Sequence, residues 1–105
     1  MIQITQESKD GWQLVGVRGR ADAESADELE NALRTAVDEH PKVAANLAGL
    51  DYISSAGLRA LIQAARAAQA KGSELAFCSP VPSVKKVFDM SGLQSILRIQ
   101  GELPC

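Results

Sequence analysis

The strongest constraint on the fold is the alternation of strand-like and helix-like segments along 105 residues. Short runs rich in apolar residues predict strands at 2–7, 13–18, 42–47, 73–78 and 96–99. Between them, apolar residues recur at helical spacing in three segments, marked by Leu29, Leu33, Ala36 and Val37, by Leu58, Leu61 and Ile62, and by Val84, Val87 and Phe88.

This alternation favours an α/β domain, because a parallel connection between strands needs a crossover that is usually a helix. We expect a single domain over residues 1–105. Its sheet is predicted to be mixed and four- to five-stranded, antiparallel at the start and parallel in the remainder, and packed by three to four helices.

Residues with special backbone preferences predict where these segments begin and end. Asp10-Gly11 is typical of a tight hairpin turn. The stretch 19–22 is expected to interrupt the second strand, after which Asp22 or Ser25 caps the first helix. Gly72 is expected to end the second helix in the left-handed conformation.

Charge and composition exclude several classes of partner. Eleven basic against thirteen acidic residues leave a net charge of −2, so we expect neither direct nucleic-acid binding nor attachment to an anionic membrane. Aromatic residues make up only 4%, too few to stack single-stranded bases. The sequence has neither an 18-residue apolar run nor a basic, apolar leader, which favours a cytoplasmic location.

The sequence lacks the residues that catalysis and metal binding usually require. His40 is the sole histidine and directly precedes a proline, so it serves neither a metal cluster nor a proton-transfer pair. A small hydrolase with Ser55 as nucleophile would lack a base and a Gly-x-Ser-x-Gly turn. We therefore expect no catalytic residue, no metal and no cofactor.

The segment 50–58 is the most informative part of the chain. It leads from an apolar run to Ser54 and Ser55 at the mouth of a helix. One serine can cap the unpaired N–H groups of the first turn, and the same place favours a covalent phosphate. Ala56 and Gly57 are small enough for another molecule to close over the hydroxyl. These residues alone are compatible with two roles for the serines, a helix cap and a phosphorylation switch.

Three segments, in the right order, resemble the STAS family and specifically its stand-alone bacterial anti-sigma factor antagonists. Gly19-Arg20-Ala21-Asp22 resembles the family's Gly-x-Leu-Asp ahead of the first helix. Asn46-Leu47 with residues 50–58 resembles the strand and loop that end in Asp-Ser-Ser/Thr-Gly-Leu. Residues 84–93 are similar to the signature of the third helix.

The resemblance implies that Ser55 is the phosphorylated serine. Ser54 stands where the family usually has aspartate, which makes it an alternative acceptor, and Ala56 stands where a second Ser or Thr usually follows. Asp22 matches an aspartate near the phosphorylation site. The partner-binding residues that we predict are Asp22, Asp51, Ser54, Ser55, Ala56, Gly57 and Leu58.

Such proteins are not enzymes but partners in a switch. The resemblance implies binding to an anti-sigma factor that is also a serine kinase of the GHKL type, release by phosphorylation, and restoration by a PP2C-like phosphatase. It also implies a monomer when free. The alternative is a soluble STAS accessory subunit of a lipid or anion transport system, which would share the fold.

Overall fold

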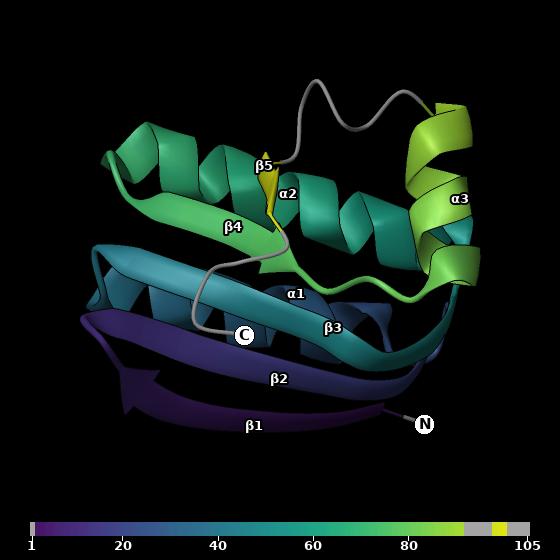
Figure 1. Cartoon of the computed structure of the whole chain (residues 1–105). Helices are drawn as coiled ribbons and strands as arrows, with labels where there is room; N and C mark the ends of the chain where they lie inside the picture. Colours follow the sequence, from purple (N-terminus) through teal and green to yellow (C-terminus); the bar gives the residue numbers. More distant parts are fainter. Residues whose placement is uncertain (1, 92–97, 101–105) are drawn as a thin grey trace.

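The computed structural model describes residues 2–91 and 98–100 of the chain (Figure 1). Its elements are, in chain order, β1 (Ile2–Lys9), β2 (Trp12–Ala21), α1 (Ala26–Glu39), β3 (Lys42–Ile53), α2 (Ser55–Lys71), β4 (Glu74–Cys78), α3 (Pro82–Ser91) and β5 (Arg98–Gln100).

The five strands form one sheet in the order β1-β2-β3-β4-β5. The β1–β2 pair is antiparallel and every later pair is parallel, as the sequence predicts. Asp10 and Gly11 adopt positive φ values of 54° and 83°, which matches the right-handed twist of the hairpin strands. The predicted α/β fold, a mixed sheet of four to five strands packed by three to four helices, is confirmed: the described residues form five strands and three helices.

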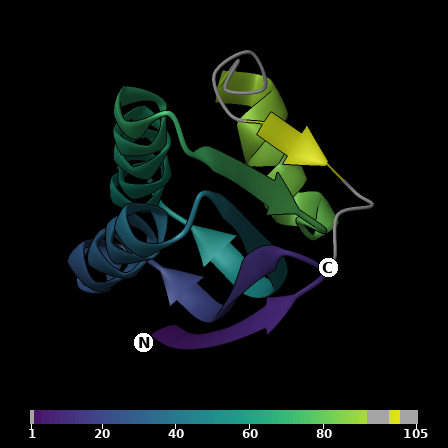
Figure 2. The ribbon, with the colours of Figure 1, turned by 90° about the vertical axis from the view of Figure 1, so that its left-hand side faces the viewer.

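Helices α1 and α2 lie side by side on one face of the sheet (Figure 2). The apolar stripe that predicts α1 faces inward, and its four residues are buried. Helix α3 contacts β3 at the end of the sheet, where Val84 and Phe88 join the same core. The core is mostly aliphatic, with Phe77 and Phe88 as its largest fully buried side chains.

Three strands are longer than predicted, and β1 exceeds its predicted end by two residues, to Lys9. Strand β2 continues through the expected break to Ala21, and β3 continues from the predicted 42–47 to Ile53. The register between them shifts near Gly19, whose φ is 102°, so the irregularity is absorbed as a bulge instead of ending the strand. Consequently β2 and β3 end together, immediately before Asp22 and Ser54. The predicted strand residues Ile96 and Leu97 lie outside the described residues.

Candidate functional site

The first turn of α2 packs directly on the end of β2. The backbone N–H of Ser54 donates to the carbonyl oxygen of Ala21 over 2.8 Å. A Cβ atom on Gly57 would lie 2.6 Å from the same oxygen and 2.9 Å from the Ala21 side chain, so only glycine permits this approach. These contacts bring Asp22, the residue after Ala21, to the end of the sheet where Ser54 and Ser55 lie.

Ser54 is the N-cap of α2 and is half-buried. Its side-chain Oγ accepts from the N–H of Gly57 at 3.2 Å, and its carbonyl accepts from the N–H of Leu58 at 2.9 Å. The prediction that one of the two serines caps the helix is thereby confirmed, and that serine is Ser54. The hydroxyl oxygen of Ser54 is therefore engaged in capping the first turn of α2.

Ser55 is the first residue of α2 and is exposed. Across the described part of the chain, its hydroxyl makes no hydrogen bond. The N–H groups of Ser55 and Ala56, at the first two helical positions, have no intrahelical acceptor. They point out of the positive end of the helix dipole, which favours an anion at this place. The arrangement can accept a phosphate on Ser55 without unmaking the cap.

Asp22 and Ser25 form a compact network ahead of α1. The Asp22 Oδ1 accepts from the backbone N–H groups of Glu24 (3.1 Å) and Ser25 (3.2 Å). The Ser25 hydroxyl lies 2.8 Å from the Arg20 carbonyl oxygen and 3.1 Å from Asp22 Oδ1, two acceptors for its one proton, and it accepts from the N–H of Asp22 at 3.0 Å. Ser25 is only 5% exposed.

This network changes the predicted capping of α1. Ser25 holds the N-cap position, yet its side chain makes no cap hydrogen bond, because its hydroxyl is committed to Arg20 and Asp22. Asp22 instead satisfies the N–H groups of the turn that precedes the helix. Desolvation raises the pKa of the Asp22 carboxyl, but the hydrogen bonds from Ser25 and Glu24 outweigh it, so the pKa lies below its ordinary value of 3.8.

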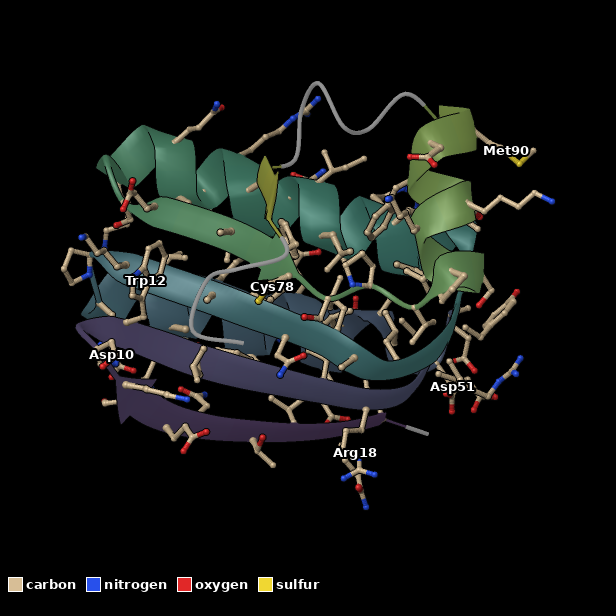
Figure 3. The ribbon with its side chains drawn as sticks, viewed as in Figure 1. Asp10, Trp12, Arg18, Asp51, Cys78 and Met90 are labelled. Carbon is tan, nitrogen blue, oxygen red and sulfur yellow. The ribbon has the colours of Figure 1, made fainter. Side chains whose placement is uncertain are left out.

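The other predicted partner-binding residues differ in accessibility. Asp51 is exposed at the same end of the sheet as α3 (Figure 3) and, with Arg18, lines a shallow hollow of about 500 Å³. Ala56 and Leu58 are half-buried, and Gly57 is buried against β2. Of the predicted set, Asp51 and Ser55 offer the most accessible side chains.

Sequence reasoning missed a stacked pair at this end of the sheet. The guanidinium carbon of Arg20 lies 4.2 Å from the ring centroid of Tyr52, close enough for a cation–π interaction. Arg20 and Tyr52 are register partners on β2 and β3. Because this pairing depends on two register shifts, no local sequence pattern indicates it.

Within residues 2–91 and 98–100, no group of three or more His, Cys, Asp or Glu side chains is placed to hold a metal ion. In the same part of the chain, every helix is too short or too polar to cross a membrane.

The comparison with protein families assigns the domain. The model of the STAS domain matches residues 3–103. The chain belongs to the STAS domain family. The match includes both strand ends and the start of α2, so it spans the Ser54-Ser55 turn.

Individual relatives agree with this assignment. The chain is 34% identical over 99 residues to BtrV of Bordetella bronchiseptica, a candidate anti-sigma factor antagonist, with 93% of this chain and 85% of BtrV covered. It is 29% identical to an anti-sigma F factor antagonist of Paenibacillus polymyxa, covering 93% and 86%. The phosphorylated form of the Bacillus cell fate determinant SpoIIAA has the same fold, with a TM-score of 0.69, 19% identity, and 95% and 93% coverage.

Proposed function

We propose that this chain is an anti-sigma factor antagonist that acts by partner switching, and that phosphorylation of Ser55 releases it from its partner. The single observation that carries the proposal is the division of roles at the start of α2. Ser54 is occupied by the cap, while Ser55 is exposed and makes no hydrogen bond within the described residues. Relatives that match nearly the whole chain are named as antagonists.

The partner is an anti-sigma factor with serine kinase activity of the GHKL type, and a PP2C-like phosphatase reverses the modification. In the forward step, Ser55 Oγ attacks the γ-phosphorus of ATP, the bond to ADP breaks, and the hydroxyl proton is released. The chain itself is a binding protein of the cytoplasm and contributes no catalytic group. Its sole histidine, His40, lies at the far end of α1 as the C-cap.

Phosphorylation would act on the interface rather than on the fold. A phosphate adds about −1.5 to −2 charges and three acceptor oxygens. The unpaired N–H groups at the start of α2 accommodate it within the chain. At the end of the sheet that also carries Asp22 and Asp51, the same charge is costly to bury against a closely packed partner. A loss of about 2.7–4 kcal/mol weakens binding roughly 100- to 1000-fold, enough to reverse a choice of partner.

Ser55 is supported over Ser54 as the acceptor by geometry. A phosphate on Ser54 would esterify the same oxygen that accepts from the Gly57 N–H, whereas one on Ser55 would leave that oxygen and its hydrogen bond unchanged. Asp22 lies at the same end of the sheet and is held by Ser25 and Glu24, which makes it a rigid acidic neighbour for the partner to meet.

The test uses the purified chain, its anti-sigma factor and ATP with Mg²⁺. Mass spectrometry should find one phosphate on Ser55, absent from Ser55→Ala and retained in Ser54→Ala. Ser55→Asp should bind the anti-sigma factor about 100-fold more weakly than the unmodified chain. If Ser55→Asp binds as tightly as the unmodified chain, release by phosphorylation of Ser55 is disproved. Co-purification with a membrane transport complex, without phosphorylation, would point to the accessory-subunit function instead.

A further inference from the structure

The two helices that lie side by side on the sheet carry opposite charges. Helix α1 has five acidic side chains against one arginine, Arg34, whereas α2 has three basic side chains and no acid. Lys71 of α2 pairs with Asp38 of α1 at 3.0 Å. Within the described part of the chain, Arg59 and Arg66 form no ion pair. Helix α2 therefore presents two uncompensated cations to solvent.

These two arginines share one face of α2 with Ser55. At 3.6 residues per turn, positions 4 and 11 residues after Ser55 lie within about 40° of it. All three side chains are exposed, and the half-buried Ile62 lies between the arginines on the same face. We call Ser55, Arg59, Ile62 and Arg66 the α2 face. It extends about 16 Å along the helix, from the phosphorylation site outward.

We propose that the α2 face docks an acidic surface of the anti-sigma factor, and that Arg59 couples phosphorylation of Ser55 to release. The inference rests on the proposed function and names the surface that it uses. Its basis is charge complementarity: the face has an apolar centre, no acidic residue, and two arginines that form no ion pair with any described residue. Arginines beside apolar contacts are enriched among the residues that dominate protein interfaces.

Arg59 has a second acceptor once Ser55 is phosphorylated. Residues four apart on a helix have Cβ atoms about 5–6 Å from each other, and the order acid before base is the favourable one. A guanidinium binds phosphate oxygens in a bidentate, charge-assisted manner. The phosphate therefore forms an ion pair with Arg59 inside the chain. The Arg59 guanidinium is then no longer available to bind the partner. At the same time the added negative charge repels the partner's acidic surface.

The first experiment measures affinity for the purified anti-sigma factor at several salt concentrations. The double variant Arg59→Gln/Arg66→Gln should bind about tenfold more weakly or worse, with a flatter salt dependence. The matched control is Arg34→Gln, which removes an exposed arginine of α1 that forms a salt bridge with Glu30. The affinity of this control for the anti-sigma factor should stay within about twofold of that of the unchanged chain. A double variant that binds within twofold of the unchanged chain overturns the proposal.

The second experiment needs no partner. Phosphoserine is introduced at position 55 by genetic encoding, and its second ionisation is followed by ³¹P NMR. Arg59 should lower the pKa of the phosphate, Arg59→Gln should raise it again, and Arg59→Lys should restore part of the shift. Identical titrations with and without Arg59 overturn the proposal.

The two proposals fail in different ways. If Ser55→Asp binds the anti-sigma factor as tightly as the unmodified chain, the proposed function fails. If Ser55→Asp loses binding while Arg59→Gln/Arg66→Gln retains it, the function stands and the α2 face is wrong.

Discussion

The starts of α1 and α2 use the same residue type in opposite ways. Each helix follows a strand end, and each has a serine at its N-cap. At α1, Ser25 is buried and its hydroxyl bonds Arg20 and Asp22. At α2, Ser54 makes the cap and leaves Ser55 exposed. The difference shows that burial and hydrogen bonding, rather than residue type, separate a structural serine from one open to modification.

The largest difference between the two helix starts is expected when the same charge is placed at both. Ser25→Asp puts a buried carboxylate against Asp22, and we expect a loss of about 3–5 kcal/mol in the free energy of unfolding. Ser55→Asp adds an acid at an exposed first turn, where the helix dipole stabilises it by about 0.3–1 kcal/mol. Urea unfolding of both variants measures this. Equal losses of unfolding free energy in the two variants would show that Ser25 and Ser55 do not differ in their structural role.

The second prediction concerns the packing that positions the α2 start. Gly57→Ala forces a methyl group against the backbone oxygen of Ala21, and overpacking of this kind costs about 1–3 kcal/mol. Gly16→Ala is the control, because its new Cβ meets only the Thr5 hydroxyl, which can rotate away. Thermal unfolding compares the two. A stable Gly57→Ala protein would mean that α2 can shift from β2.

The third prediction tests whether Ser54 serves as a cap. Ser54→Ala leaves the Gly57 N–H unsatisfied and should cost about 0.5–2 kcal/mol of unfolding free energy. Ser54→Asp should restore most of it, because aspartate caps as well as serine. Urea unfolding gives both values. If Ser54→Asp is no better than Ser54→Ala, the hydrogen bond to Gly57 contributes little.

The smallest effect is expected from pH. The pKa of Asp22 is lower in the folded chain than its ordinary value of 3.8. Its ionised form therefore stabilises the fold above that value, and this contribution is lost as pH falls through the lower, folded pKa. Asp22→Asn should flatten this part of the stability curve between neutral and acid pH, as followed by urea midpoints. An unchanged slope would show that the network around Ser25 does not depend on the charge.

Much of the site could be predicted because its signals are local. Ser54-Ser55 with the small residues after them marks a helix start, and the order of three matching segments indicates the family. The four-residue spacing of Ser55 and Arg59 is also visible in the sequence, but the sequence analysis assigns no role to Arg59. The burial of Ser25 and the stacking of Arg20 on Tyr52 were not readable, since both depend on contacts outside their own segments.

The alternation of strands and helices and the serine cap at the start of α2 follow from local sequence, because periodicity, caps and turns act over a few residues. The lengths of β2 and β3, which bring Gly57 against Ala21 and Arg20 against Tyr52, are set instead by how the strands pair and pack in the folded chain. Those contacts join residues some thirty positions apart, and they depend on strand register and packing, which no short stretch of chain encodes.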